Sequence, residues 1–477
     1  MDFNYEQVEA IRLIRAGHNV FLSGPAGTGK TSIVLEAIKE MGFVVLLAPT
    51  GIAALNFNGQ TIHSFAKLPT GLLHHSTIPT ITNNQFRMML GIVKTIIIDE
   101  ISMVRADLFV ALDLRLREAA LELGMDCWNK PWAGKQIVVL GDFFQLPPVL
   151  ATTEEELYVK SLWNGPFAFL TPEWEASKFI TVNLTKVHRQ RDPLMLSILN
   201  HIRIGDVDTR DILLPGSEPM TAIEALNHLC FRPDRHEYRG PVLCTTKTRA
   251  NEVNSHYLEI LGTEQHEFHG KILGKFLKNE FPTEEILSLQ EGQRVMALNN
   301  YRVDGGVFLY VNGDCGTISQ IYYDEEGQGH VKVDFDNAPS VEMEPFEWKS
   351  YTYATEFYNG RQVIRRIQTG SFRQLPLRPA YAFTIHKAQG LTLDAGMVDC
   401  GSGCFAPGQL YTAISRCRSL ENLYLARPIR REDVRVAPEV LSFYGGSSGF
   451  RKRTGSMPSS SWTQHELPRG TSGLYLA

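Results

Sequence analysis

Residues 20–31 have the sequence VFLSGPAGTGKT, which is the clearest indication of the fold in the chain. Val20–Leu22 is a short apolar run with β-branched and aromatic side chains, which predicts a buried strand. Gly24–Thr31 fits the P-loop pattern G-x-x-x-x-G-K-[ST], and Thr31–Met41 follows it with a helical pattern. The order strand, glycine-rich loop, helix predicts a phosphate-binding site. A glycine-rich turn without a ligand is the alternative.

The P-loop pattern implies a specific chemistry. Glycines let backbone N–H groups turn toward phosphate oxygens, and the positive end of the following helix adds to the attraction. Lys30 is expected to reach the β- and γ-phosphates of ATP, and Thr31 is expected to be a ligand of Mg²⁺. The expected cofactor-binding residues of the loop are Gly24, Pro25, Ala26, Gly27, Thr28, Gly29, Lys30 and Thr31.

Further apolar runs predict two parallel sheets and an insertion. The first set, which alternates with helical patterns, comprises Val20–Leu22, Phe43–Leu47, Thr95–Ile98 and Ile137–Leu140. The second set comprises Val242–Cys244, Ala380–Thr384, Met397–Val398 and Leu423–Leu425. Between the members of the second set, apolar Val331, Val333 and Phe335 alternate with polar residues, as in a half-buried strand. We therefore expect two α/β lobes, the second interrupted by a small antiparallel β-barrel.

Three polar residues follow predicted strands of the first lobe. Asp99 and Glu100 come directly after Thr95–Ile98. Asp99 is expected to hold Mg²⁺, and Glu100 is expected to orient and deprotonate the attacking water. Gln145, in GDFFQLPP, is a candidate hydrogen-bond donor to a γ-phosphate. The alternatives are a solvated acidic pair and a strand end that is simply terminated by proline.

The composition excludes some classes of protein. The chain has 477 residues, 43% of them hydrophobic and 21% charged, as in globular proteins, and a net charge of −5, which argues against a uniformly basic surface. No apolar run is long enough to cross a membrane, and the first residues lack the apolar core of a signal peptide. The seven cysteines show no disulfide spacing. We therefore expect an intracellular protein, cytoplasmic in a bacterium and nuclear or mitochondrial in a eukaryote.

Seven motifs together resemble one family. They are GPAGTGKT (24–31), APTGIAAL with TIHSF (48–65), IIDEISMV (97–104), LGDFFQLPPV (140–149), LTKVHRQRD (184–192), TIHKAQGLTLD (384–394) and GQLYTAISRCRSL (408–420). In sequence and in order they resemble the Pif (petite integration frequency) family of DNA helicases, in the RecD-like branch of superfamily 1. The resemblance extends over most of the chain.

The resemblance implies roles for individual residues. Gln7 corresponds to the glutamine that recognises adenine, and Arg189 and Arg416 correspond to two arginines that meet the γ-phosphate; Arg418 is a nearby competitor. An exposed helix residue and surface salt bridges are the alternatives. The residues implied to face DNA are Thr50, His63, Ser64, Phe65, His386 and Lys387. For His63 and Phe65 an ordinary place in the core is the alternative.

The same resemblance implies a domain plan with two RecA-like lobes. The first lobe is expected at 1–180, with a small wedge element at about 64–90. The second lobe is expected at 181–290 and 375–430, interrupted by a β-rich domain at 291–374. A C-terminal extension is expected at 431–477, disordered from about 445 because glycine, serine, threonine and proline dominate there.

The expected activity is that of an ATP-dependent, monomeric DNA helicase of genome maintenance, which includes repair, recombination and telomere maintenance. It would move 5′-to-3′ on single-stranded DNA and unwind duplex, forked or G-quadruplex DNA. Direction, the preference for DNA and G-quadruplex unfolding follow from the resemblance alone. The alternatives are an RNA helicase and a P-loop ATPase that acts as a protein remodeller or a binding switch.

Overall fold

The computed structural model describes residues 3–74, 77–150, 152–232, 238, 240–278, 281–302, 308–336, 338–358 and 361–445. The chain divides into a large part that ends at Ala437 and a small part that begins at Pro438, in which the described helix is α13 (Pro438–Phe443). The tail expected to be disordered lies outside the described residues from 446 onward. Among the described helices, none combines the length and the apolar character that a membrane crossing requires.

The first lobe is built on a six-stranded parallel sheet in the order β3-β2-β4-β5-β1-β6. Its strands are β1 (Val20–Ser23), β2 (Val44–Ala48), β3 (Gln60–Thr61), β4 (Thr95–Ile98), β5 (Gln136–Gly141) and β6 (Ile180–Asn183). The predicted strands of this lobe are confirmed to within one residue at each end. Their almost wholly apolar character follows from burial on both faces, because helices cover a parallel sheet on each side.

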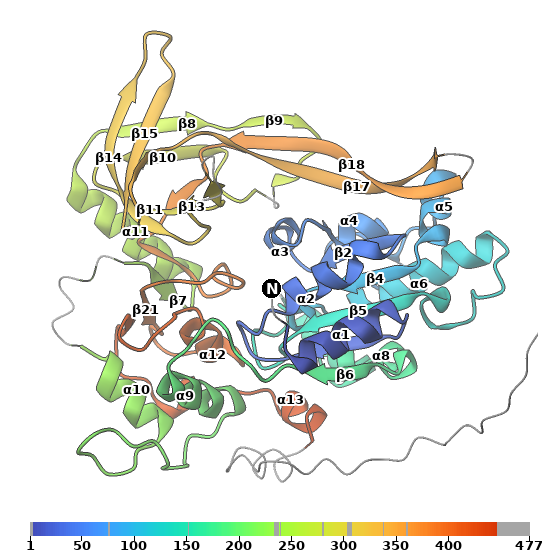
Figure 1. The fold of residues 1–477 in the computed structure, drawn as a ribbon, viewed down its shortest axis with the longest axis horizontal. Coiled ribbons are helices and arrows are strands. Elements are labelled where there is room, and N and C mark those ends of the chain that lie inside the picture. The colour runs from blue at the N-terminus through green and yellow to red at the C-terminus, as the bar shows by residue number, and fades with distance from the viewer. Residues whose placement is uncertain are drawn as a thin grey trace, which may run out of the picture. The chain divides into compact units, whose positions relative to one another are not determined.

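The helices of the first lobe connect these strands (Figure 1). They are α1 (Tyr5–Arg15), α2 (Lys30–Ala37), α3 (Gly51–Asn56), α4 (Ile62–Ala66), α5 (Asn84–Ile92), α6 (Ala106–Glu122), α7 (Thr153–Trp163) and α8 (Pro172–Ser177), with 3-10 turns η1 (Ile38–Glu40), η3 (Ile101–Met103), η4 (Pro131–Gly134) and η5 (Ala168–Leu170). α1 begins with a capping box in which Asn4 and Gln7 exchange hydrogen bonds. α1 and α2 pack with β1, β4 and β5 in one apolar core.

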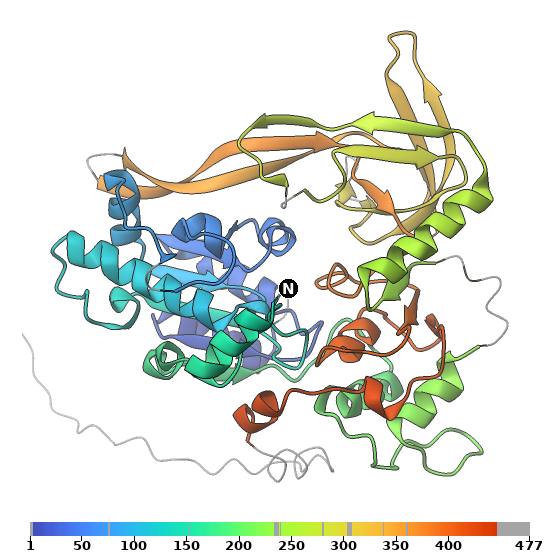
Figure 2. The same cartoon turned by 180° about the vertical axis from the view of Figure 1, so that it is seen from behind.

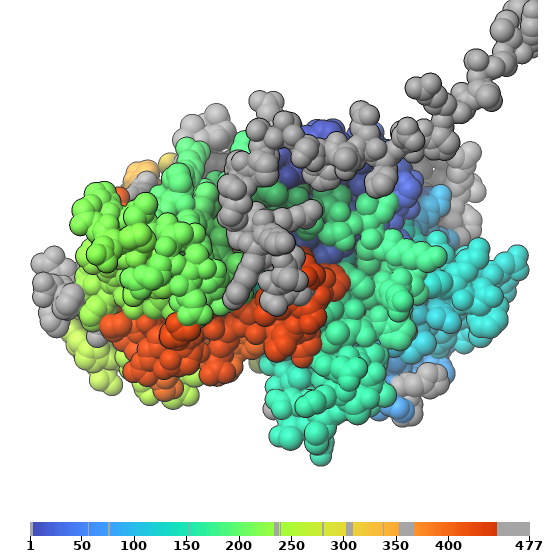
Figure 3. Space-filling model, turned by 90° about the horizontal axis from the view of Figure 1, so that it is seen from below, coloured from blue at the N-terminus to red at the C-terminus, as the bar shows by residue number. Residues whose placement is uncertain are grey.

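The second lobe has a four-stranded parallel sheet in the order β20-β7-β21-β22. The strands are β7 (Val242–Cys244), β20 (Ala382–Thr384), β21 (Gly396–Asp399) and β22 (Leu423–Leu425), and the helices are α9 (Pro193–Ile204), α10 (Ala222–Cys230), α11 (Lys247–Leu261) and α12 (Gln409–Ile414), with the 3-10 turn η8 (Arg431–Asp433). Asn227 of α10 exchanges two hydrogen bonds with the backbone of Ile429, so the segment after β22 lies beside α10, as Figure 3 shows from below. The prediction of a second α/β lobe is confirmed.

The chain between β7 and β20 forms antiparallel sheets. The main sheet has the order β16-β15-β14-β11-β19, and the others are β10-β8, β12-β13 and β17-β18-β9. The strands are β8 (Gln265–His269), β9 (Lys271–Gly274), β10 (Ile286–Gln290), β11 (Arg294–Ala297), β12 (Tyr301–Arg302), β13 (Phe308–Tyr310), β14 (Cys315–Tyr323), β15 (Gly329–Phe335), β16 (Ser340–Glu342), β17 (Phe346–Tyr358), β18 (Arg361–Gln374) and β19 (Leu377–Pro379). The alternation expected around Val331–Phe335 is confirmed, since every second side chain of β15 is buried.

A closed barrel is not confirmed in this region. Among the described residues the main sheet ends at β16 and β19, and these two strands do not pair with each other. The strands β10, β11, β13, β14, β15, β16 and β19 nevertheless share one apolar core. β8, β9 and β10 precede residue 291, and β6 continues past residue 180, so the domain limits drawn from the sequence stay predictions.

A long hairpin, β17 with β18, extends from the insertion to the first lobe (Figures 1 and 2). It contacts α4 and α5, which include the two ends of the segment expected to be a wedge. Near its base, Phe276, Trp348 and Phe372 form an apolar cluster against which Leu55 of α3 packs. The strands inserted in the second lobe therefore also contact the first lobe.

Candidate active site

The P-loop joins β1 to α2, as predicted. α2 begins at Lys30, and Gly29, its N-cap, has a φ of 81°, a left-handed conformation that favours glycine. Gly27 also has a φ of 81°, and a Cβ there would clash with the side chain of Arg189. The backbone N–H of His188 donates to the carbonyl oxygen of Gly27 at 2.8 Å. The loop therefore lies directly against the chain that follows β6.

Lys30 and Thr31 point into the site. The Lys30 Nζ donates to the carbonyl oxygens of Gly24 and Pro25 at 2.7 and 3.0 Å, and burial lowers its pKa. Phosphate oxygens would be stronger acceptors for this ammonium group than neutral carbonyls. The Thr31 hydroxyl donates to Oδ2 of Asp99 at 3.2 Å. A hydroxyl and a carboxylate at this distance are hard oxygen donors, so this pair fits a Mg²⁺ ion.

Asp99 and Glu100 end β4, and both face the cleft. Burial, followed by the charge of Glu100, raises the pKa of Asp99 to about 7. A divalent cation would reduce the repulsion between Asp99 and Glu100 by balancing their negative charges. Glu100 has φ 51° and ψ 48°, a conformation that is rare for a residue with a side chain. Such strained positions concentrate at functional sites.

Arg189 and Arg416 lie on the other side of the cleft. Arg416 is 1% exposed, and its guanidinium donates to Thr412 O, Leu391 O and Ser415 Oγ at 2.9, 3.4 and 2.8 Å. Burial and the nearby Arg416 lower the pKa of Arg189 to about 9. In the described part of the chain neither arginine forms a salt bridge. A buried and a half-buried cation without a carboxylate partner favour the binding of an anion between them.

Arg418 has a different environment. Its side chain is 56% exposed, and its Nε lies 2.9 Å from Oδ1 of Asp394. Arg416 lines the cleft, whereas Arg418 forms a surface salt bridge. The structure therefore separates two arginines that the sequence left as competitors.

These groups surround a cavity of about 560 Å³. Its lining residues are Phe3, Gln7, Ala26, Gly27, Thr28, Gly29, Lys30, Thr31, Ser32, Asp99, Glu100, Gln145, His188, Arg189, Gly390 and Arg416. Gln7 is 5% exposed, and its Nε2 lies 3.4 Å from both Thr28 O and His188 Nε2, so it is not an exposed helix residue. Phe3 and His188 were missed by the sequence analysis, although each lies beside a predicted site residue. Gly24 and Pro25, which were also predicted, do not line the cavity, but their carbonyl oxygens accept hydrogen bonds from Lys30.

A buried network joins the lobes behind the cleft. Asp142 is 0% exposed and accepts three hydrogen bonds from Arg203 of α9 at 2.8–3.3 Å. The Tyr411 hydroxyl of α12 donates to Asp142 Oδ2 at 3.0 Å and accepts from the Ala26 N–H of the P-loop at 3.4 Å. The guanidinium of Arg203 also lies 4.3 Å from the ring centroid of Phe144. No local pattern in the sequence indicates this network, because its members are far apart along the chain.

The residues expected to contact DNA separate into two groups. Thr50, His386 and Lys387 lie together around a second cavity, of about 470 Å³, which Asp99 and Glu100 also line. Thr50 caps α3 by accepting from the Ala53 N–H at 3.3 Å, which leaves its hydroxyl proton available to a phosphate. Burial lowers the pKa of both His386 and Lys387.

The other group lies on α4 and does not line that cavity. Phe65 is 2% exposed, so its ring packs in the core and presents no face on which a base could stack. Ser64 accepts a hydrogen bond from Gln60 at 2.7 Å, and burial lowers the pKa of His63. The expectation that Phe65 faces DNA is therefore not supported in this arrangement, and the alternative of a core residue describes it.

A third cavity, of about 580 Å³, was not expected from the sequence. It lies between α11, the loop before β10 and the strands β19 and β20, and it shares Lys387 with the second cavity. Its other cationic lining residues are Lys247, Lys278 and Arg378. Burial lowers the pKa of Arg378 to about 10. A groove with several cations fits a polyanion.

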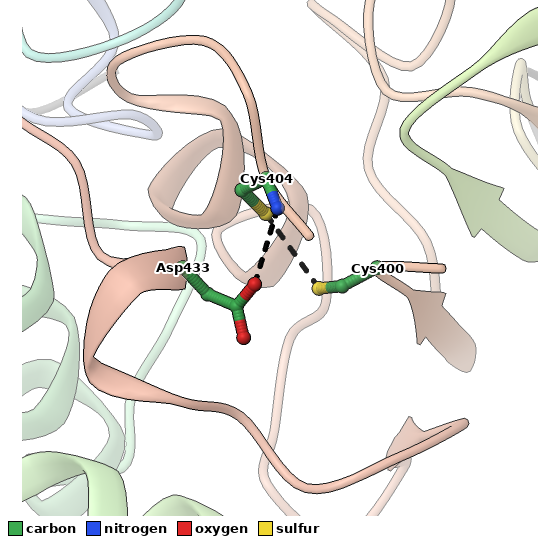
Figure 4. Close-up of side chains that lie close together, drawn as sticks. All are labelled: Cys400, Cys404 and Asp433. Carbon is green, nitrogen blue, oxygen red and sulfur yellow. Dashed lines mark hydrogen bonds between the residues drawn. The ribbon is translucent and has the colours of Figure 1, made fainter. Parts of the chain in front are cut away.

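Two cysteines lie together outside the cleft (Figure 4). The sulfur atoms of Cys400 and Cys404 are 3.6 Å apart, and the Cys404 N–H donates to Asp433 at 3.1 Å. Asp433 also accepts from both terminal nitrogens of Arg427 and from the Arg430 N–H, each at 2.8 Å. Its carboxylate is therefore committed, and two sulfurs alone fall short of a zinc site. The cluster fastens the segment after β22 to the loop before α12.

A P-loop, an acidic pair after β4 and two arginines across a cleft define a two-lobed P-loop nucleoside triphosphatase. A family model described as PIF1-like helicase matches residues 2–206. The ATP-dependent DNA helicase Pif1 of Bdellovibrio bacteriovorus is 32% identical over 94% of this chain and 93% of that protein. The chain belongs to the PIF1-like helicase family.

Solved structures are similar over nearly the whole chain. Unliganded Pif1 from Bacteroides sp is 31% identical, with a TM-score of 0.78 over 94% of this chain and 98% of that one. Bacteroides Pif1 bound to ssDNA is 30% identical, with a TM-score of 0.63 over 95% and 98%. The human ATP-dependent DNA helicase PIF1 is 31% identical over 92% of this chain, which spans 63% of that protein's length.

Proposed function

We propose that the chain is an ATP-dependent DNA helicase that moves 5′-to-3′ along single-stranded DNA. The observation that carries the proposal is the cleft, in which Lys30 and Thr31 of one lobe face Arg189 and Arg416 of the other. A triphosphate held by the P-loop would bring its γ-phosphate toward two arginines that have no carboxylate partner among the described residues. Binding would then draw the lobes together, and hydrolysis would release them.

The hydrolytic step follows from the same geometry. Lys30 and the P-loop N–H groups hold the phosphates, and Thr31 with Asp99 would hold Mg²⁺, which neutralises phosphate charge. Glu100 orients the attacking water and accepts its proton. Arg189 and Arg416 stabilise the charge that develops on the transferred phosphoryl group. Gln145 lines the same cavity and is 5% exposed, which supports a contact with the γ-phosphate.

The proposed track follows the two cavities that meet at Lys387. Thr50 and His386 lie on the first-lobe side and the second-lobe side of one cavity, and Lys247 and Arg378 line the other. Hydroxyl and cationic side chains bind phosphates without reading sequence, as a motor that moves along any strand requires. A local basic groove also explains how a chain with a net charge of −5 would bind DNA.

The relatives support DNA as the track. They are named ATP-dependent DNA helicases, and one solved relative is bound to ssDNA. We propose that the arrangement described here corresponds to a form without a strand, because the TM-score is 0.78 to the unliganded relative and 0.63 to the ssDNA-bound one. We further propose that one copy suffices and that forked and G-quadruplex DNA are substrates.

One experiment tests the proposal against its alternatives. ATPase activity is measured with Mg²⁺ and without polymer, with ssDNA and with ssRNA, and strand separation is measured on one duplex with a 5′ tail, a 3′ tail or no tail. We expect stimulation by ssDNA and unwinding of the 5′-tailed duplex. Stimulation by ssRNA in preference to ssDNA would favour an RNA helicase. If neither ssDNA nor ssRNA changes the ATPase activity and no duplex is separated, a protein remodeller or a binding switch would be favoured.

A further inference from the structure

A hydrogen bond crosses from the second lobe to the hydrolytic carboxylate of the first. The Nε2 of Gln389 donates to Oε2 of Glu100 at 3.0 Å. Gln389 is 9% exposed, so the bond is shielded from water. A hydrogen bond to a charged acceptor in such a place is stronger than one on the surface. The side-chain direction of Glu100 is thus set by a residue of the other lobe.

The other end of the same amide is poorly placed. The Oε1 of Gln389 is buried and, among the described residues, has no hydrogen-bond partner. A buried carbonyl oxygen without a hydrogen bond has a free-energy cost. In this position of Gln389 the Nε2 has a partner, Glu100, and the Oε1 has none. A different position of the turn could satisfy both ends of the amide.

Gln389 lies on the turn that carries two of the proposed DNA contacts. His386 and Lys387 precede it, and the Gln389 N–H donates to the His386 carbonyl oxygen at 3.3 Å. The Ala388 N–H donates to Thr384 O and Ile385 O, both at 3.1 Å, so the turn is a hydrogen-bonded unit. A displacement of Lys387 therefore also displaces Gln389.

Glu100 lies where the nucleotide cleft and the proposed track meet. It lines the cavity of the P-loop and also the cavity of His386 and Lys387, and Gln389 lines only the second of these among the described residues. The hydrogen bond consequently draws the carboxylate toward the track side. A general base must turn an oxygen toward the attacking water, and this hydrogen bond instead directs the Oε2 of Glu100 toward Gln389.

We infer that Gln389 is a positioning residue that holds Glu100 away from the attacking water until a strand at Lys387 moves the turn. The inference rests on the proposed function and adds a means by which the track controls hydrolysis. Without a strand, turnover is restrained by one hydrogen bond. With a strand in the groove, the turn shifts, Glu100 is released and hydrolysis accelerates.

The test replaces Gln389 by methionine, which keeps the length of the side chain and removes the amide. Turnover of ATP is measured in the full chain without polymer and with saturating ssDNA, together with KM for ATP and the Kd for ssDNA. We expect the unstimulated turnover number to rise about tenfold, the scale of one hydrogen bond to a charged acceptor. The stimulated turnover, KM and Kd should stay within about twofold, so the stimulation ratio falls.

Gln320→Met is the matched control, because Gln320 is exposed on β14 and the substitution is the same. It should leave both turnover numbers unchanged. If Gln389→Met lowers both turnover numbers by one factor, Gln389 has a packing role and the inference is wrong. If ssDNA stimulates the parent protein, an unchanged stimulation ratio in Gln389→Met also overturns the inference. A parent protein that no oligonucleotide stimulates would reject the proposed function instead, and a raised unstimulated rate in Gln389→Met would still support the restraint of Glu100.

Discussion

Replacing Asp142 by asparagine should destabilise the contact between the lobes by about 3 kcal/mol, the scale of a broken buried ion pair. Asp142 is 0% exposed and Arg203 is 9% exposed, so water solvates and screens neither charged group well. Asparagine keeps the shape of the side chain, but it removes the negative charge that accepts three hydrogen bonds from Arg203 and one from Tyr411. The loss should therefore be electrostatic and not a consequence of a cavity.

Two further variants provide a comparison for the loss of stability expected of Asp142→Asn. Tyr411→Phe removes one hydroxyl, with its hydrogen bonds to Asp142 and to the Ala26 N–H, and should cost about 1–2 kcal/mol. Asp394→Asn breaks the exposed pair with Arg418, whose side chains are 56% and 40% exposed, and should cost less than about 1 kcal/mol. The structure thus predicts an order among three substitutions as well as one magnitude.

Urea unfolding, followed by tryptophan fluorescence and circular dichroism, measures the change in the free energy of unfolding from the shift in midpoint at constant m-value. The reasoning is refuted if Asp142→Asn costs no more than Asp394→Asn. Two separate transitions in place of one would show that the lobes have become separate unfolding units.

Other variants test the hydrolytic site and the track. Lys30→Ala should abolish ATP binding, whereas Glu100→Gln should retain binding and lose turnover by about a hundredfold or more, and near-normal turnover would remove Glu100 from its role. Arg416→Ala should lower ssDNA-stimulated turnover by about a hundredfold and leave nucleotide-free ssDNA affinity intact, while Arg418→Ala should change neither by more than about twofold; equal effects would contradict the separation of the two arginines. The affinity for ssDNA should fall as salt rises, and Lys387→Ala should reduce that salt dependence; an unchanged slope in a titration of affinity against salt would place Lys387 off the track.

The sequence predicted the parts of the site that short motifs specify. The P-loop, Asp99 and Glu100 lie within a few residues of strands whose apolar runs are easy to recognise, so local pattern and tertiary place coincide. Gln7, Arg189 and Arg416 depended on family resemblance, yet all three line one cavity, together with Gln145.

The errors and omissions occur where tertiary contacts decide. Phe65 follows two polar residues, but the sequence cannot show that α4 turns its ring into the core. Asp142, Arg203 and Tyr411 are separated by long stretches of chain, so nothing local indicates that they meet. The strands β8 and β9 were missed because their alternation is weak and their pairing partners, β10 and β18, lie far along the chain.

The interrupted second lobe also determines an order of assembly. The six strands of the first lobe are complete once Asn183 has been synthesised, so its sheet can form while the rest of the chain is still on the ribosome. β7, in contrast, pairs with β20 and β21 and has to wait until the whole insertion has emerged. The long loop that this pairing closes has an entropic cost, which falls if the insertion folds first and brings its ends together. The folded insertion would then hold β7 and β20 close together while the second lobe forms around it.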